Sequence, residues 1–190
     1  MRVVLLDNTN MYNKHIPKKH ISFMFYIADY TRALLQEISR SRGISPTIKS
    51  SRYTLNKDLK QENSFIIENY KEDKLVYTTY DFERASKYIR LVNDNIVNNA
   101  LVRQLEELRL LTLTNKSNDI IKYAIPECYY TKGIYTIPYD DLIHLCKLRL
   151  HKSALLEYRL LMKEIIKTLP ETINDEFIKL DIELTKDITI

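Results

Sequence analysis

The sequence predicts an α+β fold, in which a helical majority packs on a small antiparallel sheet. Residues 20–27 alternate between two faces, as in a half-buried strand, and the apolar face carries Ile21, Phe23, Phe25 and Ile27. Apolar residues at helical spacing recur over much of the remaining chain. Only two of the 190 residues are glycine, Gly43 and Gly133. The chain can therefore form neither a dinucleotide-binding G-x-G-x-x-G fingerprint nor a G-x-x-x-x-G-K phosphate loop.

The first part of the chain is predicted to form two strands and a helix. Residues 2–6 are a short apolar run typical of a strand, and a loop leads from there to the strand over 20–27. Asp29 or Thr31 can cap a helix that runs to about Ser41, because both side chains accept hydrogen bonds from the N–H groups of a helix start.

The rest of the chain is predicted to be mostly helical. Residues 48–55 are expected to form a basic, hydroxyl-rich loop or strand, and residues 56–80 a short helix and a connection. A long helix over 81–111 is indicated by the stripe Ala85, Ile89, Val92, Ile96, Leu101, Leu105 and Leu108. The later elements are expected in this order: a helix over 118–126, a strand over 133–137, helices over 139–150 and 153–169 (the second capped by Ser153), and a terminal strand over 178–184.

Length and composition limit the classes of function. A chain of this length suits one domain with a proper core, so we expect a single domain over 1–190. The net charge of +4 is a small excess, which disfavours nucleic acid as the partner and suits a small anionic ligand. Two cysteines do not make a disulfide framework, so a reduced, cytoplasmic setting is the default. We expect no membrane span, and no metal site, because the histidines lack ligand partners at suitable spacing.

The densest candidate site is the basic segment 40–53. It contains three arginines, one lysine and four serines. Arginine donates to phosphate in a planar, bidentate fashion, and serine hydroxyl groups add neutral donors. Such a segment can hold a nucleotide phosphate without glycines. Two other interpretations stay open: a solvated basic loop whose charges complement a helix C-terminus, and a surface that binds RNA or DNA.

Three blocks of this sequence resemble the flavin-dependent thymidylate synthase family. In the first block, Arg40-Ser41-Arg42 is followed after seven residues by Ser50 and then Ser51-Arg52-Tyr53, where the family has Arg-His-Arg, seven residues, Ser and x-Arg-Tyr. The second block is 122–127, around Lys122 and Pro126, and the third is Arg149 with the helix that follows it. The three blocks lie in the family's order and together cover about residues 20–169.

The resemblance implies a nucleotide-biosynthesis enzyme of known chemistry. The family methylates C5 of dUMP to give dTMP, with methylenetetrahydrofolate as carbon donor and reduced FAD as hydride source. NADPH usually reduces the flavin. The resemblance therefore implies a methyltransferase and flavoprotein of the flavin-dependent thymidylate synthase fold, and a homotetramer with active sites built across subunits.

The resemblance also implies roles for individual residues. Arg149 is the implied catalytic residue, which would pair with the uracil edge and stabilise the charge that develops there. The implied substrate-binding residues are Glu37, Arg40, Ser50, Arg52, Lys122 and Arg149. The implied FAD-binding residues are Arg40, Ser41, Arg42 and His144.

Several positions depart from the family pattern, mostly on the flavin side. Ser41 replaces the middle histidine of Arg-His-Arg, Asp140 stands where a cationic flavin contact is expected, and His144 replaces an asparagine. Residues 8–19 stand where the family has a longer helical segment. We therefore expect a diverged, N-terminally shortened member. The alternatives are a nucleotide-binding paralogue with altered one-carbon chemistry at C5, or one without catalysis.

Overall fold

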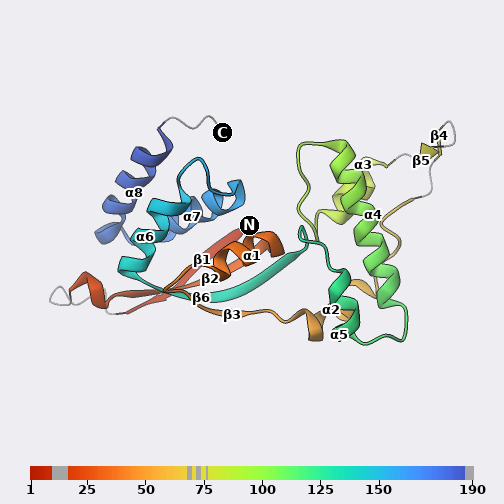
Figure 1. Ribbon diagram of the computed structural model, residues 1–190, viewed down its shortest axis with the longest axis horizontal. Helices are drawn as coiled ribbons and strands as arrows, with labels where there is room; N and C mark the ends of the chain where they lie inside the picture. Colours follow the sequence, from red (N-terminus) through yellow and green to blue (C-terminus); the bar gives the residue numbers. More distant parts are fainter. Residues whose placement is uncertain (10–16, 68–69, 72–73, 76, 187–190) are drawn as a thin grey trace. The chain divides into compact units, whose positions relative to one another are not determined.

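The computed structural model describes residues 1–9, 17–67, 70–71, 74–75 and 77–186 (Figure 1). The chain divides into two compact units, which are described separately: unit 1 combines Met1–Ile48 with Thr131–Ile190, and unit 2 is Lys49–Tyr130. The loop predicted ahead of the second strand falls partly on residues 10–16, which lie outside the described residues. Each unit has its own cluster of buried apolar side chains.

The sheet of unit 1 has four strands in the order β1-β2-β6-β3. Its strands are β1 (Arg2–Asn8), β2 (Ser22–Thr31), β3 (Ser45–Ile48) and β6 (Tyr130–Pro138). β1 pairs antiparallel with β2, and β3 pairs antiparallel with β6. The α+β class and the three strands predicted over 2–6, 20–27 and 133–137 are confirmed, although β2 and β6 run longer than expected.

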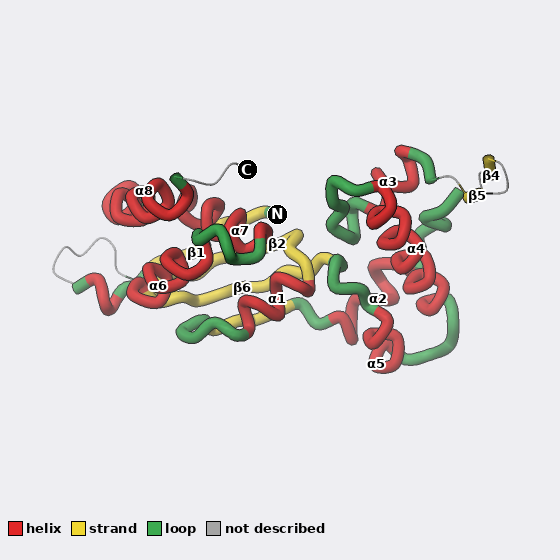
Figure 2. Tube along the Cα trace, turned by 45° about the horizontal axis from the view of Figure 1, so that its top comes forward, coloured by secondary structure: helices red, strands yellow, loops and turns green. Residues whose placement is uncertain are grey.

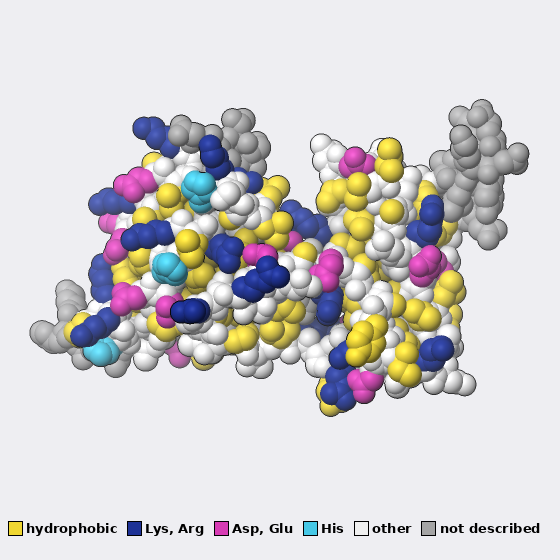
Figure 3. Space-filling view, in the orientation of Figure 1, with side chains coloured by type: hydrophobic (Ala, Val, Ile, Leu, Met, Phe, Trp, Pro, Cys, Tyr) yellow, Lys and Arg dark blue, Asp and Glu magenta, His cyan; other side chains and the backbone are white. Residues whose placement is uncertain are grey.

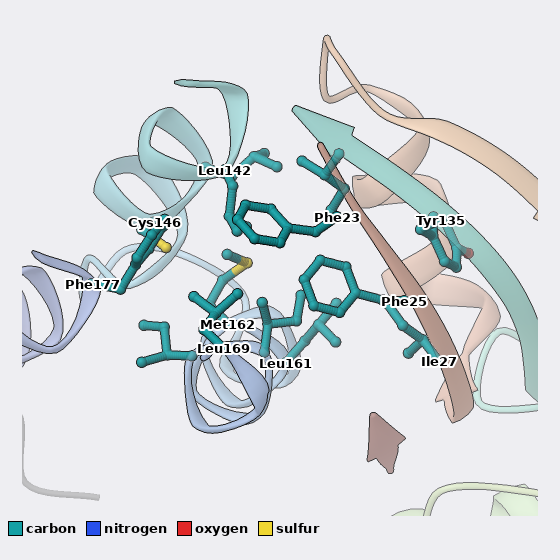
Figure 4. Packing of buried hydrophobic residues seen from close by; sticks show 14 of the residues in the cluster. Phe23, Phe25, Ile27, Tyr135, Leu142, Cys146, Leu161, Met162, Leu169 and Phe177 are labelled. Carbon is teal, nitrogen blue, oxygen red and sulfur yellow. The ribbon is translucent and has the colours of Figure 1, made fainter. Parts of the chain in front are cut away.

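β2 supplies the centre of the core of unit 1. Phe23, Phe25 and Ile27 are almost fully buried, and they point to one face because alternate residues of a strand share a face. Figure 4 shows these side chains meeting residues of the helices that follow the sheet. The helices are α6 (Tyr139–Arg149), α7 (Leu156–Thr168) and α8 (Glu171–Thr185) (Figure 2).

The terminal strand predicted over 178–184 is wrong, because helix α8 covers this segment. The apolar residues that pack on the core are spaced by three or four positions: Ile173, Phe177, Leu180 and Leu184. The alternating partners Ile178 and Ile182 are instead 40% and 62% exposed. The apolar residues of this segment fit both the two-residue spacing of a strand and the helical spacing of three or four residues. Contacts with α6 and α7 favour the helix.

The start of helix α1 (Arg32–Ser39) is fixed by Thr31. The Thr31 hydroxyl group accepts a hydrogen bond from the backbone N–H of Leu34 at 3.1 Å, so of the two predicted caps Thr31 is the one used. The buried carboxylate of Glu157, on α7, accepts from the Thr31 N–H and hydroxyl at 2.9 and 2.6 Å. Asp29 instead adopts a left-handed backbone, with φ of 59°. The cap and the carboxylate together tie α1 to α7.

Unit 2 consists mainly of helices around the second apolar cluster. Its elements are α2 (Ser51–Leu59), β4 (Tyr70–Lys71), β5 (Lys74–Leu75), α3 (Thr79–Ala85), α4 (Asn95–Thr112), α5 (Asn118–Ile121) and the 3-10 turn η2 (Lys122–Ala124). The loop or strand predicted over 48–55 is confirmed as far as Ser50 and wrong beyond it, because α2 begins at Ser51. The helix predicted over 118–126 is confirmed in α5, but η2 replaces its second half.

The single helix predicted over 81–111 is wrong, because the chain leaves the helix after Ala85 and re-enters at Asn95. Ile89 forms a bridge to Tyr129 in this interval. Asp94 caps α4 by accepting from the Val97 N–H at 3.0 Å. The apolar stripe of the sequence runs across the break, so the spacing alone could not reveal it.

Another 3-10 turn, η1 (Lys18–His20), precedes β2. α7 begins at Leu156 with Leu155 at the cap position, so the predicted cap Ser153 lies outside that helix. None of the helices in the described ranges is long and apolar enough to cross a membrane.

Candidate active site

In unit 1, the ends of α1 and α6 meet around the carboxylate of Glu37. Arg149 is the last residue of α6, and its Nη1 donates to Oε2 of Glu37 at 3.3 Å. Arg40 donates from its own Nη1 to Oε1 of the same carboxylate, also at 3.3 Å. One carboxylate therefore bridges two guanidinium groups, and three residues predicted to bind substrate come together.

The guanidinium group of Arg149 is partly buried, and not all of its N–H donors have a hydrogen-bond partner in the protein. Its side chain is 22% exposed, and its Cζ lies 4.7 Å from the centroid of the Tyr158 ring, within cation–π range. Its Nε is buried and has no hydrogen-bond partner. Because a guanidinium has five N–H donors and a fixed plane, Arg149 retains oriented donors that a ligand can occupy.

The hydroxyl group of Ser41 connects the end of α1 to α7. Ser41 Oγ lies 3.3 Å from the backbone oxygen of Glu37 and 3.0 Å from the hydroxyl oxygen of Tyr158. Burial raises the pKa of Tyr158, against the opposing effects of the Ser41 bond and the Arg149 charge, so the phenol stays protonated at neutral pH. Tyr158 was missed in the sequence because it occupies one position of the apolar stripe of α7, where a core role is the usual one.

The turn after α1 presents its arginines to solvent. The Arg40 side chain is 71% exposed, and Arg42 is exposed as well. Gly43 has a φ of 75°, and the carboxylate of Asp141 occupies the space that a Cβ at this position would need. Only glycine suits both conditions. Figure 3 shows Lys and Arg side chains gathered beside acidic ones over α1.

In unit 2, α2 contacts both α5 and η2. Two predicted site residues lie here, Arg52 on α2 and Lys122 on η2. The guanidinium of Arg52 binds both carboxylate oxygens of Asp119, through Nε and through Nη2, the latter at 3.1 Å. This hydrogen bonding raises the pKa of Arg52. The Lys122 Nζ lies 5.6 Å from the ring centroid of Tyr123. Ser50 precedes α2 and is exposed, and its side chain makes no capping bond.

Comparison with known proteins identifies the family. A family model described as "Thymidylate synthase complementing protein" matches residues 4–173. The chain belongs to this family. The resemblance that the three sequence blocks predicted is therefore confirmed.

Curated relatives carry the name flavin-dependent thymidylate synthase. The chain is 39% identical over 168 residues to the enzyme of Campylobacter jejuni (strain RM1221), a match that covers 88% of this chain and 75% of the relative. It is 40% identical over 168 residues to the enzyme of Wolinella succinogenes, with 88% of this chain and 76% of the relative covered. Both relatives belong to the family that the motif predicted.

Solved structures show the same fold. Thymidylate Synthase X (ThyX) from Helicobacter pylori, with FAD and dUMP, matches at a TM-score of 0.82 and 30% identity, over 95% of this chain and 99% of that one. The UMP/dUMP methylase PolB from Streptomyces cacaoi matches at a TM-score of 0.60 and 16% identity, over 94% of each chain. At that identity the second match supports the fold alone.

The geometry joins some of the predicted residues and leaves others apart. Among members of unit 1, Glu37, Arg40, Ser41 and Arg149 form one connected group. His144 is exposed on α6, and because it lies five residues from Arg149 it points about 140° away around the helix. Asp140 is exposed in the first turn of the same helix. No cluster of three or more potential metal ligands occurs within the described parts of the chain.

Proposed function

We propose that this chain is a flavin-dependent thymidylate synthase, which methylates C5 of dUMP to give dTMP. The curated relatives carry this name, and one similar solved protein holds FAD and dUMP. The observation that carries the proposal is the state of Arg149. Its guanidinium contacts both the Tyr158 ring and the Glu37 carboxylate, and its side chain stays 22% exposed.

Arg149 is suited to bind and polarise the uracil ring. The side chain is 22% exposed, so a uracil carbonyl oxygen can approach the guanidinium donors that Glu37 does not use. The guanidinium stays ionised, so it would also stabilise negative charge that develops on this oxygen when C5 reacts. Glu37 keeps the guanidinium in place through the Oε2 bond. We propose Arg149 as the catalytic residue and Glu37 as its partner at the substrate.

Three residues of unit 2 are proposed to bind the phosphate and sugar of dUMP. Arg52 and Lys122 supply positive charge, and Arg52 already binds a bidentate anion, the Asp119 carboxylate. A phosphate offers the same pair of oxygen acceptors. The Ser50 hydroxyl, which makes no capping bond, is a neutral donor two residues before Arg52.

The residues present fit FAD at the turn after α1. Arg40 and Arg42 are exposed guanidinium groups on one short segment, and such a pair matches a pyrophosphate. Ser41 and His144 are the further proposed contacts. Reduced FAD would supply the hydride when bound. NADPH as its reductant and methylenetetrahydrofolate as the carbon donor are part of the same proposal.

The proposal includes a cytoplasmic homotetramer. The face of the sheet opposite the helices exposes apolar side chains, at Val4, Leu6, Met24 and Ile134, each between 37% and 49% exposed. Exposed apolar faces of this kind favour subunit contacts. Sedimentation analysis should give the mass of four chains, and Leu6→Lys should lower it. A single domain over 1–190 stays a prediction, which one cooperative unfolding transition would support.

The deciding experiment combines three measurements on the purified chain. We expect a yellow protein with a flavin absorbance spectrum, calorimetric binding of dUMP, and tritium release from C5-labelled dUMP when NADPH and methylenetetrahydrofolate are supplied. A colourless protein that does not respond to added FAD contradicts the flavin part. Binding of dUMP without tritium release would instead support the non-catalytic paralogue, which the carboxylate of Asp140 in the first turn of α6 favours.

A further inference from the structure

Tyr158 is the group around which the arginine of the candidate site is arranged. It lies in the first turns of α7 and is only 2% exposed. The centroid of its ring lies 4.7 Å from the Arg149 Cζ, and its hydroxyl oxygen lies 3.0 Å from the Ser41 Oγ. One buried side chain therefore touches both the implied catalytic arginine and the Arg40–Arg42 segment.

The direction of the hydrogen bond between Tyr158 and Ser41 follows from counting protons. Each hydroxyl group has one proton to donate. The backbone oxygen of Glu37 can only accept, so the Ser41 proton is directed to it. Tyr158 must then donate to Ser41. Burial raises the pKa of Tyr158, so this donor keeps its proton across the physiological range.

These contacts form a closed circuit. Tyr158 donates to Ser41, Ser41 donates to the backbone of Glu37, the Glu37 carboxylate accepts from Arg149, and the Arg149 Cζ lies over the Tyr158 ring. Two contacts fix a guanidinium better than one, since the carboxylate and the ring each restrain it separately. The N–H donors that Glu37 does not use are then held in one place.

We propose that Tyr158 is a positioning residue for the proposed reaction: it holds the Arg149 guanidinium in place for the uracil ring and couples it to the Arg40–Arg42 segment through Ser41. The assignment rests on the proposed function. The hydroxyl group and the ring of Tyr158 have separate roles. The hydroxyl group ties the ring to Ser41 at the end of α1, and the ring contacts the Arg149 guanidinium.

The test compares Tyr158→Phe, Ser41→Ala and their double variant, measured by calorimetric dUMP affinity and by kcat and KM. Tyr158→Phe and Ser41→Ala should each weaken dUMP binding by about 3- to 10-fold, the effect of one hydrogen bond, and the double variant should be no weaker than either. Tyr158→Leu, which also removes the ring, should weaken binding further, by about 10-fold or more.

Tyr135→Phe is the matched control. Tyr135 is 1% exposed, lies in the same cluster and shares a buried hydroxyl–hydroxyl hydrogen bond with Tyr30, but makes no contact with Arg149. It should lower the thermal midpoint as much as Tyr158→Phe does, yet leave dUMP affinity within about twofold of wild type.

Three results would overturn the assignment. Equal dUMP affinities for Tyr158→Phe and Tyr135→Phe would show that Tyr158 only packs in the core and does not position Arg149. Additive losses in the double variant would show that Ser41 and Tyr158 act separately. Both results leave the proposed function intact if wild type turns over dUMP. Failure of wild type to bind dUMP would overturn the proposed function together with the assignment.

Discussion

The two units differ in how completely their arginines are paired. In unit 2, Arg52, Arg84 and Arg109 are each bound to a carboxylate. In unit 1, the side chains of Arg32, Arg149 and Arg159 each keep a buried Nε without a partner, although Arg149 also contacts Glu37. A guanidinium whose donors are all satisfied stabilises the fold, whereas one that keeps unused donors and stays partly exposed, as Arg149 does, can bind a ligand.

The arginines of unit 2 hold an irregular segment against the helices. Arg84 donates to the backbone oxygens of Asn63 and Ser64, at 2.8 and 2.5 Å, and Arg109 donates to that of Glu62 at 3.3 Å. The buried carboxylate of Glu106 binds Arg109 at 2.7 Å and accepts from the N–H of Phe65 at 2.9 Å. These bonds replace the regular secondary structure that this segment lacks.

The largest effect is expected from Glu106→Gln. It keeps the shape of the side chain but leaves the buried guanidinium of Arg109 without a counter-charge. Removing one partner of a buried pair costs about 3–5 kcal/mol, so the free energy of unfolding should fall by about that amount in a denaturant titration. Glu107→Gln, on the exposed side of α4, is the control and should change it little. Equal effects of the two variants would contradict the structural role of the Glu106–Arg109 pair.

The same pair gives a pH dependence with a definite sign. Desolvation pushes the pKa of Glu106 upward, but the hydrogen bonds from Arg109 and Phe65 outweigh it and hold the pKa below its ordinary value of 4.5. A carboxyl group whose folded-state pKa is lowered stabilises the fold above its unfolded-state pKa, and this contribution is lost as the pH falls through the folded-state pKa. Unfolding midpoints should therefore drop on acidification below about pH 4.5, and the drop should be shallower in Glu106→Gln.

Arg149→Ala should have the next largest effect, on turnover rather than stability. Loss of a donor to developing negative charge lowers kcat by about 100- to 1,000-fold. The thermal midpoint should stay close to that of wild type, because the side chain is partly exposed and its Nε has no partner to lose. Arg149→Lys, which keeps the charge without the planar fork, should also be strongly impaired. Retained turnover in either variant would place Arg149 among the fold-stabilising arginines.

The sequence predicted those elements whose signals are local. The alternation of β2, the Thr31 cap and helix α6 all depend on neighbouring residues, and all three are confirmed. The family motif was equally readable, because residue types at fixed spacing carry it. The sequence also singled out Arg149 as a candidate site residue, although not what surrounds it.

The elements that failed depend on distant contacts. The break between α3 and α4 is supported by the bridge from Ile89 to Tyr129, which no local pattern announces. In α8, alternate and helical spacing coincide, and only packing on α6 and α7 decides between them. Tyr158 was missed for the same reason: its proposed role rests on contacts with Ser41 and Arg149, which are distant in the sequence.

Gly43→Ala tests whether unit 1 depends on the turn that presents its exposed arginines. A left-handed backbone costs a residue with a Cβ about 1–2 kcal/mol, and the new methyl group would overlap the Asp141 carboxylate. We expect a lower thermal midpoint and weaker FAD binding, measured by flavin fluorescence. Asp141→Ala added to this variant should relieve the overlap but not the backbone strain, so recovery should be partial. Full recovery would show that the strain at Gly43 is unimportant.

Asp119→Asn tests whether Arg52 stabilises the fold or binds a ligand. Its bond to Asp119 resembles the fold-stabilising pairs of unit 2, but both side chains are 54% exposed, so the pair should contribute little to stability. Asp119 and a phosphate would compete for the same guanidinium donors. Asp119→Asn should therefore leave the thermal midpoint nearly unchanged and tighten dUMP binding by at most about fivefold, while Arg52→Ala weakens it by about 10-fold. If Asp119→Asn weakened dUMP binding instead, the Asp119 carboxylate would be positioning Arg52 for the ligand. The difference between the two units would then lie in how deeply their arginines are buried, because a carboxylate would hold the ligand-binding arginine in both.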